Sequence, residues 1–356
     1  MSTTGQTIPV ASAAHPRGRR LLIPLLLAFL IGSLLVGVGL GPVIVPPEVV
    51  IAILLSKLGI TLDIPVTQQQ MAVLWNIRLP RVLLGALSGA ALAVSGALLQ
   101  GVFRNPLADP GLIGVSSGAA LGAVAVIVSG LAPLGLFTLP FAAFVSGAAT
   151  TLLVYRLSRR HGHTDIAMLL LVGLALNAVA GAFTGLLTYL ADDAALRSIV
   201  FWTMGGLGGA LWETLLAAAP GIALALLLAP RLGRALNLFA LGEVEARHLG
   251  VTVEQVKRAA VLLAALATGA SVALVGPIGF IGLIVPHMVR LAAGPDHRLL
   301  LPAAALGGAG LLILADLAAR TVAAPAEVPV GLITALAGGP FFLALILRSR
   351  QRYGWE

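Results

Sequence analysis

The chain has 356 residues, of which 59% are hydrophobic and only 10% are charged, and its formal net charge is +8. This composition leaves too little polar surface to cover a soluble globule of that size, so a soluble enzyme is excluded and lipid is the expected solvent. The basic residues form short clusters between apolar runs, which is typical of orientation signals in membrane proteins and argues against nucleic acid as a partner. Since no cysteine occurs, disulfides and thiolate metal sites are excluded as well.

Ten apolar runs are candidates for helices that cross a bilayer, which takes about 20 residues per crossing. The eighth run is short, so nine spans remain an alternative. The first run follows three arginines but lacks a clear small-residue cleavage site, so we interpret it as a retained helix and not as a signal peptide. The sequence thus predicts an all-α polytopic membrane protein, a compact ten-helix bundle. The predicted spans are 21–41, 82–100, 112–130, 137–156, 166–190, 212–229, 259–275, 280–293, 299–319 and 331–347.

The distribution of positive charge orients these spans. With the amino terminus in the cytoplasm, 17 of the 22 lysines and arginines fall inside, as the positive-inside rule requires. We therefore expect a cytoplasmic tail at 1–20, a single membrane domain at 21–348 with a long cytoplasmic segment at 230–258, and a cytoplasmic tail at 349–356. The five basic residues left outside are Lys57, Arg78, Arg81, Arg197 and Arg320.

Three of these outer arginines stand at the mouths of spans: Arg78 and Arg81 in NIRLPR, and Arg320 in ADLAAR. Because a guanidinium binds a carboxylate bidentately, an arginine that departs from the charge bias suggests a specific anionic partner. Snorkelling to lipid phosphate is the alternative.

The longest cytoplasmic interval contains ALGEVEARHLGV at 240–251. It is charged and has helical spacing, so it is suited to lie in a groove of another protein, with an ordinary solvated loop as the alternative. The chain has no G-x-x-x-x-G-K-[ST] phosphate loop, so it is not expected to bind ATP in that manner, and a partner must supply the energy. No H-E-x-x-H motif and no buried carboxylate pair appears, so we expect neither a catalytic residue nor a metal site.

Six ordered motifs together resemble a known family: RLPR, SGALLQ, RNPLADPGLIGVSSGA, LGEVEARHLGV, GPIGFIGLIVPH and AEVPVGLITALAGGPFF. They are similar to the FecCD/BtuC-type permeases, the type II ABC importers of iron-siderophores, haem and cobalamin. The resemblance implies a permease in the bacterial inner membrane, working with two ATPase subunits that bind the ATP and with a periplasmic substrate-binding protein. It implies a homodimer, and a dimer with a paralogue stays open.

The resemblance also implies roles for particular residues. Arg78, Arg81 and Arg320 would receive acidic residues of the binding protein. The segment that couples to the ATPase would comprise Leu241, Gly242, Glu243, Ala246, Leu249 and Gly250.

The cargo is inferred from the outer interval LADDAALRSIVFWTMGGLGGALW, which is most similar to haem permeases. Haem would be the transported substrate and not a resident cofactor; a ferric siderophore or cobalamin is the alternative. Arg197 could pair with a propionate, and Tyr189 or Met204 could touch the porphyrin or its iron, although packing is the simpler interpretation of these two. All six histidines fall on or near the cytoplasmic side of the predicted topology, so none meets haem at the entrance.

An ion-coupled secondary transporter is the rival mechanism. Such proteins keep ionisable residues near the bilayer midplane. Apart from Glu213, the second residue of its span, only Asp316 is acidic within the predicted spans, and it lies near the outer end of its span.

Overall fold

The computed structural model describes residues 16–41, 43, 45–160 and 162–353. Apart from an antiparallel pair of two-residue strands, β1 (Arg159–Arg160) and β2 (His163–Thr164), every regular element in these ranges is helical, which confirms the all-α prediction. The α-helices are α1 (Pro16–Gly39), α2 (Pro47–Ser56), α3 (Gln68–Ala72), α4 (Leu79–Phe103), α5 (Val115–Val128), α6 (Thr138–Leu157), α7 (Ile166–Tyr189), α8 (Asp193–Met204), α9 (Trp212–Leu228), α10 (Gly233–Phe239), α11 (Glu243–His248), α12 (Val253–Val275), α13 (Ile281–Ala293), α14 (His297–Thr321) and α15 (Val330–Tyr353). A π-helix, η1 (Val73–Arg78), and three 3-10 turns, η2 (Pro110–Ile113), η3 (Ala132–Leu134) and η4 (Ala229–Leu232), complete the described elements.

Each of the ten predicted spans falls on one helix, namely α1, α4, α5, α6, α7, α9, α12, α13, α14 and α15. By length and composition, 7 helical stretches of the described chain can cross a membrane, while α5, α13 and the apolar part of α15 are shorter. The multi-pass architecture is therefore confirmed, and the count of ten and the orientation stay predictions. Of the predicted tails, residues 1–15 and 354–356 lie outside the described residues, and the rest continues α1 and α15.

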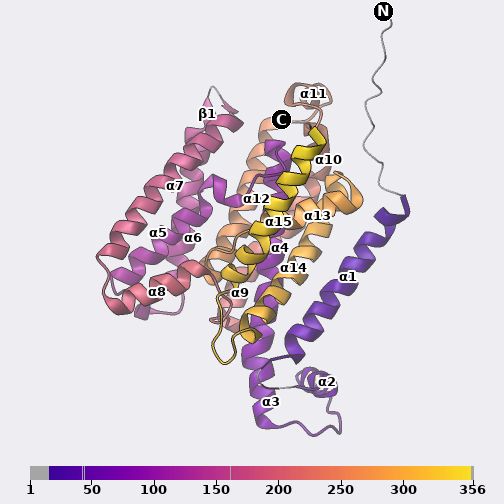
Figure 1. Ribbon diagram of the computed structural model, residues 1–356, viewed down its shortest axis with the longest axis vertical. Coiled ribbons are helices and arrows are strands. Elements are labelled where there is room, and N and C mark those ends of the chain that lie inside the picture. The colour runs from indigo at the N-terminus through magenta and orange to yellow at the C-terminus, as the bar shows by residue number, and fades with distance from the viewer. Residues whose placement is uncertain (1–15, 42, 44, 161, 354–356) are drawn as a thin grey trace, which may run out of the picture.

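Helix α4 is the central element of the bundle (Figure 1). It packs against α14, α12, α13 and α9, and it is buried along almost its whole length. The sequence of α4 suits this position, because its many Gly, Ala and Ser residues let neighbouring helices pack closely against it. A second group, α5, α6 and α7, packs together beside this core, and α1 lies against α14.

Gly85, Gly89 and Gly96 lie at helical spacing in α4, a pattern which predicts that neighbouring helices approach it closely. A Cβ at Gly89 would stand 2.1 Å from the carbonyl oxygen of Gly308 on α14. A Cβ at Gly96 would stand 1.8 Å from that of Gly282 on α13. Both distances are far shorter than any real contact, so these helices touch backbone to backbone.

The bundle has two distinct ends (Figure 1). One carries α2, α3 and α8, and we call it the α8 end. The other carries α10, α11 and the β1–β2 hairpin, and we call it the α11 end. Helices α2, α3 and α8 lie in intervals for which the sequence predicted no helix.

The π-helix η1 brings Arg78 and Arg81 into the bundle at the α8 end. Pro80 has no N–H to donate to Asn76, and its ring clashes with the preceding turn of a regular helix. The helix accommodates Pro80 by a wider π-helical turn, in which the Leu79 N–H donates to the Leu74 carbonyl, five residues back. The helix then continues as α4 without a break.

Candidate functional site

A buried ion cluster at the α8 end joins α4, α14 and the segment before α15. The Arg81 guanidinium donates to Asp316 on α14, with Nε 3.0 Å from Oδ1 and Nη2 2.9 Å from Oδ1. On its other edge, Nη1 donates to both carboxylate oxygens of Glu327, at 3.0 Å each. Arg81 and Asp316 are buried, whereas the Glu327 side chain is 52% exposed. The cluster therefore has a fixed inner pair and one carboxylate that reaches solvent.

The other two predicted docking arginines are buried as well. Arg320 lies one turn after Asp316, with Nε 3.7 Å from Oδ2, and it donates from Nη2 to the Gly37 carbonyl of α1. The Arg78 guanidinium donates to the carbonyls of Val38 and Gly39 at 3.0 and 2.9 Å, and also to that of Val43.

These positions change the interpretation drawn from the sequence. The charge bias suggested that the outer arginines await an external anion, but each already has carboxylate or carbonyl partners within the chain. Lys57 and Arg197, in contrast, are exposed at this end. Docking by Arg78, Arg81 and Arg320 consequently stays a prediction, and of their described partners the exposed Glu327 is the one best placed to yield to an incoming carboxylate.

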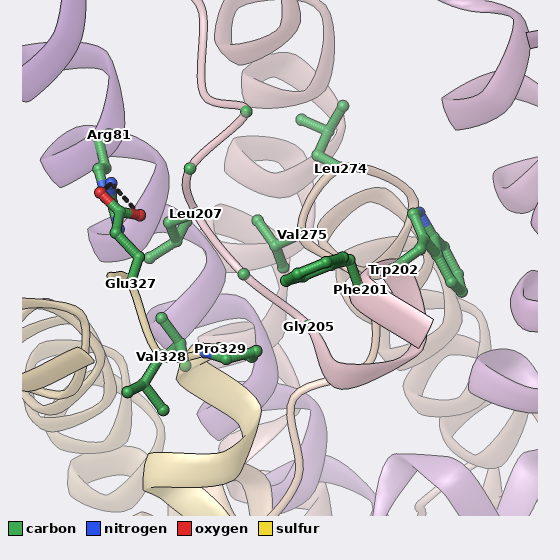
Figure 2. Close-up of a pocket in the computed structure, with 14 residues that line it drawn as sticks. Arg81, Phe201, Trp202, Gly205, Leu207, Leu274, Val275, Glu327, Val328 and Pro329 are labelled. Carbon is green, nitrogen blue, oxygen red and sulfur yellow. Dashed lines mark hydrogen bonds and ion pairs between the residues drawn. The ribbon is translucent and has the colours of Figure 1, made fainter. Parts of the chain in front are cut away.

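A pocket of about 430 Å³ opens beside this cluster (Figure 2), and we call it the Arg81 pocket. Arg81 and Glu327 stand on one side of it, and Phe201 of α8 on the other. Its lining also includes Trp202, the glycine-rich run 205–209 and the residues that lead into α15. A predominantly apolar wall with one charged pair is the usual composition of a ligand site.

Glycines tie the walls of the Arg81 pocket together. Gly205 has φ +70°, and its carbonyl accepts from Gly331 N at the start of α15, at 3.2 Å. The next residue, Gly206, donates to the Val275 carbonyl at the end of α12, at 2.7 Å. A Cβ at Gly331 would stand 2.0 Å from the Met204 carbonyl. The end of α8 and the start of α15 cannot move far independently.

The three predicted pathway residues do not gather in this pocket. Tyr189, at the end of α7, is 85% exposed, Arg197 is exposed on α8, and Met204 is half-buried. Phe201 and Glu327 lie in the stretches FWTMGGLGG and AEVPVG, which the sequence analysis quoted. The sequence did not indicate that these two side chains would line a pocket together. In the part of the chain that the structure describes, no group of three or more His, Cys, Asp or Glu residues could hold a metal ion.

At the α11 end, the predicted coupling segment is a short helix between two glycine turns. Gly242 has φ +125° and Gly250 has φ +86°, conformations in which a side chain is strained. Ala246 is fully buried, while Leu241 and Leu249 are 62% and 59% exposed. Leu241 and Leu249 can thus contact a partner, whereas Ala246 and the glycines shape the segment.

Glu243 fixes this segment to the bundle through the buried Lys257 of α12. Lys257 Nζ lies 2.6 Å from Glu243 Oε2 and donates to the Thr164 carbonyl of β2 at 2.9 Å. Glu254, one turn before Lys257, accepts from the Thr164 N–H at 2.9 Å and from the Tyr155 hydroxyl of α6 at 3.0 Å. The coupling segment, the hairpin, α6 and α12 therefore share one polar network.

Asp296 makes a second link at this end, between α10 and α14. Its carboxylate caps α14 by accepting from Arg298 N at 3.0 Å, and it accepts from Asn237 of α10 at 2.7 Å. Hydrogen bonds from the Arg298 side chain, and then those from Asn237 and the backbone, hold the pKa of Asp296 far below its ordinary value. The cap therefore stays charged at physiological pH.

Known proteins resemble this chain over most of its length. The model of the FecCD transport family matches residues 25–348. The hemin transport system permease protein HmuU of Yersinia pestis is 53% identical over 290 residues, which are 80% of this chain and 86% of that protein. The cobalamin import system permease protein BtuC of Halobacterium salinarum is 45% identical over 296 residues, 82% of this chain and 77% of that one. A solved inward-facing structure of a metal-chelate type ABC transporter has a TM-score of 0.80 at 34% identity, covering 92% of this chain and 99% of that one.

Proposed function

This chain belongs to the FecCD transport family, and from that premise we propose that it is the haem-conducting permease of an importer in the bacterial inner membrane. The resemblance drawn from its six motifs is confirmed, and the family provides the membrane subunits of ABC importers. The observation that carries haem as cargo is the 53% identity to a hemin permease. Cobalamin stays the second candidate, because a cobalamin permease is 45% identical.

Two copies of this chain would form the pore, with two ATPase subunits at the α11 end and a periplasmic binding protein at the α8 end. The exposed leucines of the coupling segment support the first placement, because an apolar helix face needs a covering surface. A homodimer would present its α8-end features twice, once to each lobe of the binding protein.

Haem would enter past α8. Arg197 is exposed there and would pair with a propionate, and in the Arg81 pocket the Phe201 ring would pack against the porphyrin. Tyr189 and Met204, at or near the ends of the helices that lead there, would add weak contacts. Weak contacts suit a transporter, because a tight site would hold the cargo in place.

Docking would work by exchange at Arg81. A carboxylate of the binding protein would replace Glu327 on the solvent-facing edge of the guanidinium, while Asp316 keeps the inner edge occupied. Glu327 lies only three residues before α15, so its release would loosen the segment that closes the Arg81 pocket. Arg78 and Arg320 would reinforce the positive potential of this site.

The proposed function is tested by uptake into proteoliposomes that contain this chain and its ATPase subunit. We expect hemin uptake to require ATP and the cognate binding protein, and to persist when ionophores collapse all ion gradients. An ATPase that cannot hydrolyse ATP is the control, and cobalamin and a ferric siderophore are the competing cargoes. Uptake of cobalamin in place of hemin would overturn the cargo, and uptake driven by an ion gradient without ATP would overturn the mechanism.

If Glu327 competes with the binding protein for Arg81, removal of the Glu327 charge should strengthen docking. Glu327→Gln should strengthen binding of the cognate binding protein about tenfold at low salt, because the internal competitor for Arg81 loses its charge. Glu48→Gln, which removes an exposed carboxylate from α2 at the same end, is the matched control for a general change in surface charge. Binding measured by surface plasmon resonance that is equal in the two variants, or weaker in Glu327→Gln, would rule out the exchange.

A further inference from the structure

A second cavity, of about 720 Å³, lies at the α11 end, opposite the Arg81 pocket, and we call it the Arg104 cavity. Phe103 and Arg104 line it from the end of α4, Arg160 and His163 from the β1–β2 hairpin, and Ile166 and Leu170 from the start of α7. Its volume lies within the range of about 300–1,000 Å³ that ligand pockets usually span.

We propose that the Arg104 cavity is an exit site, which holds the cargo briefly after it has crossed the bundle. The ligand class is a flat, apolar metal chelate with two carboxylates, and in this respect the inference rests on haem as the proposed cargo. Arg104 and Arg160 bind the carboxylates, and the His163 imidazole is a transient ligand of the iron.

The charges around the cavity leave its two arginines available. Both acidic groups of the lining are engaged: Glu243 pairs with Lys257, and Asp165 caps α7 by accepting from Ala167 N at 2.8 Å and Met168 N at 3.1 Å. The side chains of Arg104 and Arg160 are exposed, and neither guanidinium has a hydrogen-bond or ion-pair partner within the described residues. With three basic residues, Arg104, Arg160 and Lys257, against the two acidic residues Asp165 and Glu243, the lining has a formal charge of +1. Its available cations are guanidinium groups, which bind carboxylates in bidentate geometry.

Backbone geometry gives further support at Arg104. This residue ends α4 with φ +48°, in the left-handed region that residues other than glycine rarely adopt. Conformations of this kind gather at functional sites, where the surrounding structure enforces them. Here the turn places a charged side chain, where a glycine would be the relaxed choice, on the rim of the cavity.

The remaining walls suit the other parts of such a ligand. Phe103, Ile166 and Leu170 offer apolar surface to the ring, and His163 is exposed at the rim with an unpaired imidazole within the described residues. Neutral imidazole is a common axial ligand of haem iron. Arg104, Arg160 and His163 are all exposed, so each would make a weak contact with the ligand. Weak contacts allow the ligand to be captured and then released into the cytoplasm.

The test uses the full chain in lipid nanodiscs without its ATPase subunit. Hemin binding is followed by Soret absorbance and iron-free protoporphyrin IX by fluorescence, and empty nanodiscs correct for partition into lipid. His163→Ala should weaken hemin binding about tenfold, remove the spectrum of histidine-ligated iron and leave protoporphyrin binding unchanged. Arg104→Gln/Arg160→Gln should weaken both ligands about tenfold, because both carry the two carboxylates. His248→Ala and Arg234→Gln, which change exposed residues outside the cavity at the same end, should bind as the wild type does.

The outcomes separate the exit site from the cargo. If the complete importer transports hemin but His163→Ala and the double arginine variant bind and transport it as the wild type does, the exit site is wrong and the cargo stands. If the arginine variant instead loses the ATPase subunit on size-exclusion chromatography with hemin binding unchanged, the cavity belongs to the partner and the proposal is overturned. If the importer carries no hemin at all, the proposed cargo is wrong, and the exit site for it is wrong as well.

Discussion

Arg81→Met should lower the free energy of unfolding of the purified chain by about 3–5 kcal/mol, because it leaves the buried Asp316 carboxylate without its main counter-charge. Arg81 meets Asp316 with two nitrogens, and the remaining positive charge beside that carboxylate is Arg320, whose Nε is 3.7 Å away and makes no hydrogen bond. Thermal and denaturant unfolding in detergent would measure the loss. Arg197→Met removes an exposed arginine at the same end and should change stability by less than about 0.5 kcal/mol.

A second substitution separates the role of Arg81 in the fold from its role in docking. Arg81→Met/Asp316→Asn removes both charges of the inner pair, so it should recover part of the lost stability. If Arg81 receives the binding protein, docking to this double variant stays weak although the chain is folded. Recovery of docking together with stability would show that Arg81 serves the fold alone, and an unchanged stability of Arg81→Met would show that the buried pair contributes little.

The helical framework could be predicted because its signal is local. A run of about 20 apolar residues identifies a span without knowledge of its neighbours. The glycines of α4 likewise predict close packing, but they do not identify the residues packed against them, Gly308 and Gly282. Helices α2, α3 and α8 escaped prediction because they are short, and α8 lies in an interval that we expected to be an outer loop.

The arginine partners could not be predicted, because they depend on contacts between distant parts of the chain. Arg81 is 235 positions from Asp316 and 246 from Glu327. The sequence marked Arg81 as an outward arginine and Asp316 as an acid within a span, but it gave no role to Glu327. The sequence could not show that these residues contact one another. Arginines that have partners within the chain were therefore interpreted as free to bind an external anion.

The same limit applies to the coupling segment, where the structure suggests how force would pass into the bundle. Glu243 and Lys257 are 14 positions apart, and their pairing depends on the Gly250 turn between α11 and α12. Lys257 also holds the Thr164 carbonyl, and Glu254 holds the Thr164 N–H. A displacement of α11 by the ATPase would thereby reach the hairpin and the start of α7 without passing along the chain.

Lys257→Met should therefore uncouple ATP hydrolysis from uptake. Because allosteric coupling is typically about 1–3 kcal/mol, we expect the ratio of hemin taken up to ATP hydrolysed in proteoliposomes to fall by about 5–150-fold, with hydrolysis no longer stimulated by the binding protein. Arg258→Met, at the adjacent exposed position of α12, is the matched control and should keep the wild-type ratio.

The double variant Glu243→Gln/Lys257→Met decides whether the ion pair transmits force or only stabilises the fold. Removal of both charges relieves the unpaired group that either single change leaves behind, so stability should recover. If the pair transmits the motion of α11, uptake in the double variant stays as low as in Lys257→Met, because the link between the coupling segment and the hairpin is still broken. A double variant that regains both stability and coupling would reduce the pair to a structural role, and the motion would then have to travel through the direct connection from α11 to α12.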